Sequence, residues 1–178
     1  GNSQGAYSRR MVKRPVVFAI VVVLFVVLQT QGQERFSYFQ ASTPESVGRL
    51  LDLADLQDDD VVVDLGSGKG LIPLTAARMN ARLRGRGVEI DPKLVKESND
   101  QAKREGLADR VSFEHQNAFD VDLRDATVVT MWLFPELMRL LRPVILERAR
   151  PGTRILTSTW ALGSWQPDKV SNGGAPIY

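Results

Sequence analysis

The chain has 178 residues, of which 43% are hydrophobic, and this is enough for one domain with a single buried core. It has no cysteine and one histidine, His115, so disulfides and thiolate catalysis are excluded and no metal site is expected. The formal net charge of +2 arises in residues 1–35, which carry +4, whereas the remaining 143 residues carry −2 and show no electrostatic footprint for a nucleic acid.

The first predicted feature along the chain is a basic and hydrophobic segment, residues 1–35. Arginines and a lysine between residues 9 and 14 precede an uninterrupted apolar run of 13 residues, from Val16 to Leu28. A membrane-spanning helix needs about 20 residues, and the apolar part of a signal peptide has about 7–15. The length therefore favours a signal-like segment or a shallow membrane anchor over residues 15–30, with a short transmembrane helix as the alternative.

Residues 36–178 are predicted to form one folded domain. Its first helix is expected to begin at Pro44, because Thr43 is a good N-cap and proline is favoured in the first helical turn. Apolar residues at helical spacing, from Val47 to Ala54, give this helix one hydrophobic face.

The stretch from Val61 to Gly70 is the most informative part of the chain. Its first five residues are typical of a buried parallel strand, and a turn with glycines at positions 66, 68 and 70 follows them. A helix is expected from Leu71, so that the turn and the helix N-terminus meet a small-molecule ligand at the carboxyl end of the strand. Two other glycine motifs fit less well. A Walker A loop needs a glycine at position 63, which is Val63, and a dinucleotide-binding fingerprint needs one at position 71, which is Leu71.

Strands and helices alternate beyond this turn, which predicts a parallel sheet with right-handed crossovers. The fold class is therefore α/β, with three layers and a mostly parallel, Rossmann-like sheet. The expected strands cover residues 86–90, 111–113, 126–133 and 154–160, and the expected helices run from 92 to 103 and from 135 to about 148.

Two further positions have residues suited to a nucleotide-like ligand. Glu89 lies 23 residues after Gly66 and ends the second strand. An acid at about this distance accepts hydrogen bonds from ribose hydroxyls. After the third strand, Asn117 and the adjoining Ala118 are placed to meet an adenine ring, although Asn117 is also a good turn residue.

The Asp-x-Gly-x-Gly-x-Gly pattern that begins at Asp64 resembles motif I of the class I S-adenosylmethionine-dependent methyltransferases. The resemblance implies a Rossmann-like methyltransferase fold, with S-adenosylmethionine as the cofactor. The residues expected to bind this cofactor are Asp64, Gly66, Ser67, Gly68, Gly70, Glu89, Asn117 and Ala118.

The stretch that ends the fourth strand would lie beside the transferable methyl group. It lacks the Asn- or Asp-Pro-Pro-aromatic signature of many nucleic-acid amine methyltransferases. Trp132 and Phe134 are candidate walls of an acceptor pocket, and Glu136 is the nearest carboxylate, so these three are the candidate catalytic residues. Aromatic walls attract ammonium groups, and an apolar pocket lowers the pKa of an amine. Plain core packing of the two rings is an equally open interpretation.

Five short stretches are similar to a narrower family, the membrane-associated lysine methyltransferases of the mitochondrial ATP synthase c-subunit and adenine nucleotide translocase type. These stretches are Thr43-Pro44-Glu45, Val63-Asp64-Leu65-Gly66-Ser67-Gly68, Gly87-Val88-Glu89-Ile90-Asp91-Pro92, Leu133-Phe134-Pro135-Glu136 and Trp165-Gln166-Pro167. The second and third also resemble the nucleosomal histone-core lysine methyltransferases. The sequence departs from the narrower family at Lys69, where an acid is usual, and before Thr43, where Tyr38 lies two residues too far away.

This resemblance implies N-methylation of a protein lysine by a membrane-associated enzyme. The alternatives are a small-molecule or lipid methyltransferase, and a non-catalytic module that binds S-adenosylmethionine. Because the cofactor is not expected outside the cell, the domain is expected to face the cytoplasm or the mitochondrial matrix. The methyltransferase fold also implies a C-terminal hairpin, with its turn at residues 171–174 and an incomplete returning strand at 175–178.

Overall fold

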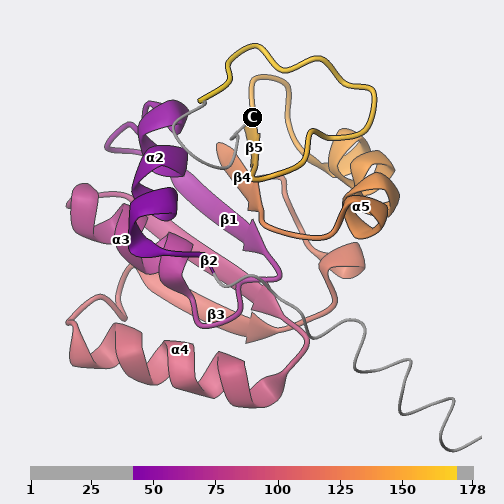
Figure 1. Ribbon diagram of the computed structural model, residues 1–178. Coiled ribbons are helices and arrows are strands. Elements are labelled where there is room, and N and C mark those ends of the chain that lie inside the picture. Colours follow the sequence, from indigo (N-terminus) through magenta and orange to yellow (C-terminus); the bar gives the residue numbers. More distant parts are fainter. Residues whose placement is uncertain (1–41, 172–178) are drawn as a thin grey trace, which may run out of the picture. The chain divides into compact units, whose positions relative to one another are not determined.

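A sheet of five parallel strands is the centre of the computed structural model, which describes residues 42–171 (Figure 1). The strands are β1 (Val61–Leu65), β2 (Arg84–Glu89), β3 (Val111–His115), β4 (Val128–Met131) and β5 (Arg154–Thr157). Their order, β3-β2-β1-β4-β5, places β1 in the middle, and the strand order reverses between β1 and β4. In sheets of this kind, ligands bind at the reversal, outside the carboxyl ends of the strands.

Within residues 42–171, four helices and one 3-10 turn cover the two faces of the sheet. They are α2 (Pro44–Ala54), α3 (Leu71–Met79), α4 (Pro92–Arg104), the 3-10 turn η1 (Ala118–Asp120) and α5 (Pro135–Arg148). Figure 1 shows α2, α3 and α4 on one face and α5 on the other. The fold is thus the expected three-layer, Rossmann-like arrangement.

Two hydrophobic clusters hold these layers together, one on each face of the sheet. Leu50, Leu74 and Ala102, from α2, α3 and α4, belong to the cluster that contains Val62 of β1. Residues of α5 belong to the other cluster, which contains Val63. Successive side chains of a strand point to opposite faces, so β1 is buried on both sides and needs the continuous apolar sequence that it has.

β1 has the predicted bounds and the helix ends agree with the predicted ones within one residue, whereas the ends of the other four strands differ. β4 is shorter than the predicted 126–133, and β5 ends at Thr157 instead of residue 160. β4 and β5 end side by side, because their last residues, Met131 and Thr157, are paired with each other. Two residues after Thr157 the backbone turns at Thr159, whose φ is 72°. β2 begins earlier, at Arg84, and excludes Ile90, which is exposed.

The features predicted for the two chain ends lie outside the described residues. These are the apolar run of residues 16–28 and the hairpin turn and returning strand beyond residue 171. Within residues 42–171, no helix combines the length and the apolar character that crossing a bilayer requires.

Arg154 of β5 connects three segments at the amino ends of the strands. Its guanidinium donates to the carbonyls of Ala54 and Asp55, at 2.7 and 2.8 Å, and pairs with the buried carboxylate of Asp60. Burial raises the pKa of Asp60, but hydrogen bonds from Thr127, from the backbone of Gln57 and from Arg154 outweigh this and lower it overall. The stabilisation is therefore complete above the ordinary aspartate pKa and is lost as the pH falls through the lowered value.

Replacing Arg154 by alanine is expected to reduce the free energy of unfolding by about 2–4 kcal/mol, because Asp60 would remain buried without its cation. Urea unfolding at pH 7 measures this. Arg82→Ala is the matched control, since Arg82 pairs with Asp58 at 2.6 Å but both side chains are exposed. The control should lose less than about 1 kcal/mol, and equal losses in the two variants would contradict a structural role for Arg154.

Candidate functional site

The glycine turn lies at the carboxyl end of β1 and is tied to β2. The amides of Gly66 and Ser67 donate to the carbonyl of Val88, at 2.9 and 3.0 Å. Gly66, Gly68 and Gly70 have φ values of 76°, 52° and 74°, a left-handed region that other residues rarely adopt. The three alternate glycines are therefore required by the backbone path.

Of the three glycines in the turn, only Gly68 has free space at the position that a side chain would occupy. A Cβ added to Gly66 would lie 2.7 Å from Leu133 Cδ2, and one added to Gly70 would lie 2.4 Å from Phe113 Cζ. A Cβ on Gly68 would meet no described atom within 4 Å. The turn is thus packed at its two outer glycines and accessible at Gly68, as a loop must be if a ligand is to approach its backbone closely.

The helix that follows this turn begins without a side-chain cap. α3 starts after Gly70, and in the described structure no side chain accepts from its first amides. By contrast, Thr43 caps α2 and Asp91 caps α4. Uncapped amides at a helix N-terminus favour a polar or negatively charged partner.

The carboxylate of Glu89 lies against the glycine turn. It accepts from the amide of Gly68 at 2.8 Å, and from those of Ile90 and Asp91 at 2.8 and 3.0 Å. A carboxylate has about four acceptor positions, so these three bonds leave room for at least one hydroxyl of a ligand. The fold therefore brings together two of the predicted cofactor residues, Gly68 and Glu89, at the carboxyl edge of β1 and β2. The bond from Glu89 to the ribose stays a prediction.

Asp64 is placed differently from Glu89, because it lies inside the sheet at the end of β1. It is 3% exposed and accepts a hydrogen bond from the Thr130 hydroxyl at 2.7 Å. Burial raises the pKa of Asp64 to about 7; the bond from Thr130 opposes this rise, and the charge of Glu89 adds to it. The described contact of Asp64 thus ties β1 to β4, and its predicted contact with the cofactor remains a prediction.

The raised pKa of Asp64 determines whether the free energy of unfolding rises or falls with pH. Between the unfolded pKa of about 3.9 and the folded value of about 7, the folded chain holds a proton on Asp64 that the unfolded chain has lost. The free energy of unfolding should therefore fall as the pH rises through this window, by up to about 1.4 kcal/mol per pH unit. Asp64→Asn, which cannot titrate, is expected to lose this slope when urea unfolding is measured from pH 5 to 7. Parallel curves for the two proteins would disprove the assignment.

The predicted adenine-binding pair lies in the connection between β3 and β4. The Asn117 side chain accepts from the amide of Phe119 at 3.0 Å and caps η1, which contains Ala118. The described contact of Asn117 is thus the turn contact that the sequence left open, and its contact with adenine stays a prediction.

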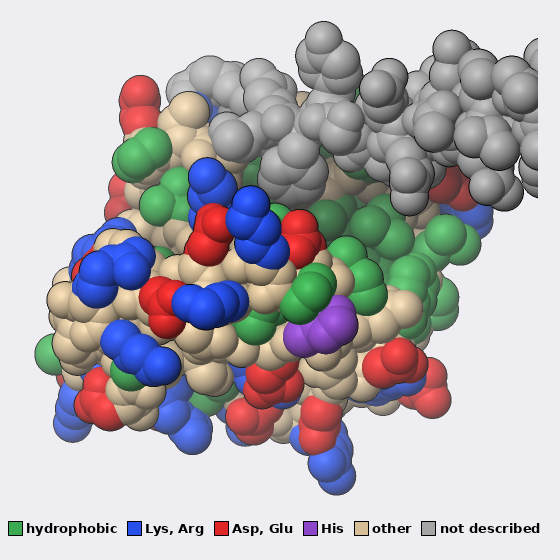
Figure 2. All heavy atoms as spheres, turned by 90° about the horizontal axis from the view of Figure 1, so that it is seen from below, with side chains coloured by type: hydrophobic (Ala, Val, Ile, Leu, Met, Phe, Trp, Pro, Cys, Tyr) green, Lys and Arg blue, Asp and Glu red, His purple; other side chains and the backbone are tan. Residues whose placement is uncertain are grey.

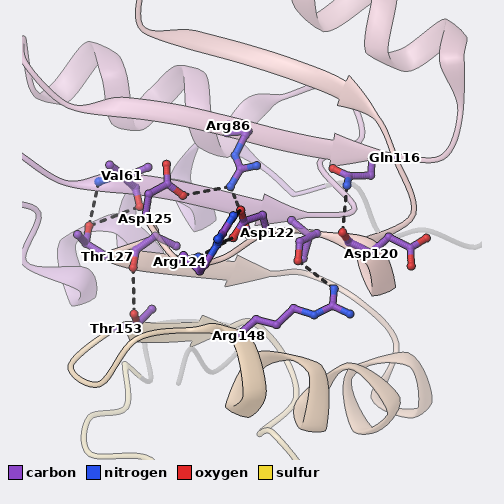
Figure 3. Close-up of polar contacts among 12 residues, drawn as sticks. Val61, Arg86, Gln116, Asp120, Asp122, Arg124, Asp125, Thr127, Arg148 and Thr153 are labelled. Atoms are coloured by element: carbon purple, nitrogen blue, oxygen red, sulfur yellow. Dashed lines mark hydrogen bonds and ion pairs between the residues drawn. The ribbon is translucent and has the colours of Figure 1, made fainter.

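Two arginines hold this connection from opposite sides (Figure 3). Arg148 of α5 donates to the carbonyls of Phe119 and Val121, at 2.7 and 3.0 Å. Arg86 of β2 contacts the carbonyl of Asp122 and the carboxylate of Asp125. Because these donors come from two elements of the core, the backbone of the connection is well anchored.

The three predicted catalytic residues follow β4, next to the turn. Trp132 is partly buried and packs against the cluster that contains Val62, whereas the ring of Phe134 is 40% exposed. Glu136 is exposed and pairs with Arg139 at 2.6 Å, and this hydrogen bond lowers the pKa of the Glu136 carboxyl. Core packing thus explains the partial burial of Trp132. The catalytic roles of all three residues remain predictions.

Sequence reasoning missed Ser98, a buried polar residue that contacts the site. Ser98 of α4 is 1% exposed, and its hydroxyl donates to the carbonyl of Gly68 at 3.2 Å. A signal was available, because Ser98 continues the sparse apolar face of its helix, three residues after Val95 and four before Ala102. A small polar residue at such a position indicates a buried hydrogen-bond partner.

Figure 2 shows the face of the molecule seen from below Figure 1, the side on which α4 lies. Basic and acidic side chains are interspersed over part of this face, and hydrophobic side chains gather on another part. No large area of positive charge, such as a nucleic-acid backbone would require, is visible among the described residues of this face.

Comparison with known proteins adds to this geometry. The model of the ANTKMT methyltransferase domain matches residues 64–169. A protein-lysine N-methyltransferase of Saccharolobus islandicus is 36% identical over 129 residues, which are 72% of this chain and 80% of that protein. An adenine nucleotide translocase lysine N-methyltransferase of Mus musculus is 33% identical over 113 residues; the match covers 64% of this chain and about half, 49%, of the mouse protein.

A solved structure also matches over most of the chain. The crystal structure of an RNA methyltransferase from Salinibacter ruber, in complex with S-adenosyl-L-homocysteine, has a TM-score of 0.75 and 41% sequence identity. The match covers 78% of this chain and 90% of that one.

Proposed function

This chain belongs to the ANTKMT methyltransferase family, and from that premise we propose that it transfers methyl groups from S-adenosylmethionine to the ε-amino groups of protein lysines. It is a class I S-adenosylmethionine-dependent methyltransferase by family and fold. The observation that carries the proposal is the carboxylate of Glu89 held against the open glycine Gly68, at the carboxyl edge of the sheet.

The residues at this edge fit the cofactor. Glu89 would accept hydrogen bonds from the ribose, Asn117 and Ala118 would meet the adenine, and the turn at Gly68 would let the backbone approach the methionine part. When bound, S-adenosylmethionine supplies a methyl group activated by its sulfonium. The protein's share of catalysis is to orient the acceptor and to exclude water.

The acceptor side of the site suits an amine. A lysine must lose a proton before it can accept a methyl group, and an apolar surrounding lowers the pKa of the amine. Trp132 and Phe134 would supply such a surrounding beside the turn. Their rings would attract the lysine while it is still protonated and, after the transfer, the methylated product, which is again cationic. Two relatives are lysine N-methyltransferases by name, and this supports a protein lysine over a small molecule or a lipid as the methyl acceptor.

The proposal is tested by radiolabelled methyl transfer to a hypomethylated cell extract. We expect the label in protein, as methylated lysine after complete hydrolysis, and we expect it to resist ribonuclease. Because one relative is described as an RNA methyltransferase, label that is lost on ribonuclease treatment would favour an RNA acceptor instead. Label that partitions into organic solvent would favour a lipid. Cofactor binding without any transfer would indicate a binding module.

We also propose that residues 15–30 associate with a membrane and that the domain faces the cytoplasm or the mitochondrial matrix. Membrane association is supported by the sequence, where basic residues precede the apolar run and the family resemblance includes a hydrophobic N-terminal segment. The orientation rests on the cofactor, which is not expected outside the cell. It favours a shallow anchor, because a spanning helix with basic residues at its N-terminal end would place the domain outside by the positive-inside rule. In intact cells, the domain should be protected from added protease. Digestion from outside would refute this orientation.

A further inference from the structure

Three consecutive residues after β5 are unusual in different ways. Ser158 is 1% exposed, and its hydroxyl has no hydrogen-bond partner within the described residues. Thr159 has a φ of 72°, a left-handed conformation that is an outlier for a β-branched residue. Trp160 is 50% exposed. We call residues 158–160 the post-β5 loop.

The register of the sheet places this loop at the candidate site. Leu65 of β1 is paired with Met131 of β4, and Met131 is paired with Thr157 of β5. The glycine turn, the segment with Trp132 and Phe134, and the post-β5 loop therefore leave the sheet at the same edge, on neighbouring strands about 4.8 Å apart. Trp160 follows the end of β5 by the same number of residues as Phe134 follows the end of β4.

A tight bend keeps Trp160 close to this edge. The Thr157 hydroxyl donates to the carbonyl of Trp160 at 2.7 Å, and the left-handed Thr159 turns the chain between them. Strained backbone and buried unpaired polar groups persist where the surrounding structure enforces them, and they cluster at functional sites. The bend leaves a large aromatic ring half-exposed at this edge of the sheet instead of burying it.

We propose that the post-β5 loop forms one wall of the acceptor site and that the ring of Trp160 receives the cationic lysine side chain opposite the segment with Phe134. This inference rests on the proposed lysine acceptor. Tryptophan has the strongest cation–π attraction of the aromatic side chains, and it acts on lysine and on every methylated form, since all carry a positive charge. Trp160 is thus a specificity-determining residue, which recognises the acceptor and does not bind the cofactor.

The test uses a cationic probe and does not depend on turnover. The full-length protein, saturated with S-adenosylhomocysteine, is titrated with Nα-acetyl-Nε-trimethyl-lysine amide and with its neutral carbon isostere. The wild type should bind the cation more tightly than the isostere. Trp160→Ala should weaken binding of the cation by about 5- to 30-fold, the range for a largely desolvated cation–π contact, and Trp160→Phe should weaken it less.

Trp165→Ala is the matched control. Trp165 is also a half-exposed tryptophan of the C-terminal region, with 40% of it accessible, but its ring lies under Arg142 at 5.4 Å. We expect this variant to bind the cationic probe within twofold of the wild type. Both alanine variants should keep their affinity for S-adenosylhomocysteine within twofold, which shows that the fold and the cofactor site are intact.

The outcomes separate this inference from the proposed function. Equal binding of the cationic probe by Trp160→Ala and Trp165→Ala overturns the inference, as does equal binding of cation and isostere by the wild type. In a methyl-transfer assay, full lysine methylation by Trp160→Ala also overturns it and leaves the proposed function standing. Trp160-dependent binding of the cation in a protein that methylates no lysine refutes the proposed function but supports an ammonium-binding wall.

Discussion

Replacing Glu89 by alanine should weaken the binding of S-adenosylmethionine by about 10- to 150-fold, which corresponds to about 1.5–3 kcal/mol for hydrogen bonds to a charged group. The lost acceptor would otherwise meet the ribose hydroxyls. The same carboxylate also holds the amide of Gly68, so its removal loosens the turn that faces the ligand. Both consequences weaken binding, and isothermal titration calorimetry measures their sum.

Two variants control this experiment. Glu89→Gln keeps the size of the side chain and one carbonyl acceptor, so its loss should be smaller. Glu114→Ala removes an exposed acid from the adjacent strand, where Glu114 is paired with Val88, and should bind the cofactor like the wild type. A Glu89→Ala protein that is folded and binds with unchanged affinity would eliminate Glu89 as the ribose ligand.

Replacing Gly70 by alanine is expected to cause the largest loss of stability, about 2–5 kcal/mol. The new Cβ would lie 2.4 and 2.6 Å from two atoms of the Phe113 ring, in a position where φ is +74°. The left-handed conformation contributes about 1–2 kcal/mol for a residue with a Cβ, and overpacking adds about 1–3 kcal/mol. Urea unfolding at constant pH is the measurement.

Gly68→Ala separates the two causes. Gly68 shares the left-handed conformation, with φ +52°, but its Cβ would meet no described atom within 4 Å. This variant should therefore lose only about 1–2 kcal/mol of stability and should instead obstruct the cofactor. A second change, Phe113→Leu, should restore part of the stability of Gly70→Ala. If Gly68→Ala and Gly70→Ala lose the same stability, steric conflict with Phe113 is not the cause.

The core of the fold could be predicted from short stretches of sequence. The valines of β1 indicate a strand buried on both faces, and the glycines after it indicate a turn that needs left-handed backbone. Thr43 and Asp91 mark the starts of α2 and α4, and Glu89 marks the end of β2. Each of these features depends on residues close together in the chain, so periodicity, capping and turn chemistry are sufficient to find them.

The contacts that shape the candidate site depend on residues far apart in the chain. Gly68 and Glu89 are separated by 21 residues, and Asp64 and Thr130 by 66. No local pattern shows that one of these two carboxylates is buried with a raised pKa while the other faces the turn. Whether a strand ends at residue 157 or 160 likewise depends on how long its neighbour stays paired with it.

The sequence by itself therefore determined the order of strands and helices, the glycine turn and the family, because local chemistry and motif spacing specify them. Only the tertiary structure decided that Phe113 blocks Gly70, that Ser98 binds the turn, and that the loop after β5 exposes Trp160 at the edge where the turn lies. The physical reason is that packing and hydrogen bonding between distant segments set burial, strand length and pKa, and these come into being only when the sheet has assembled.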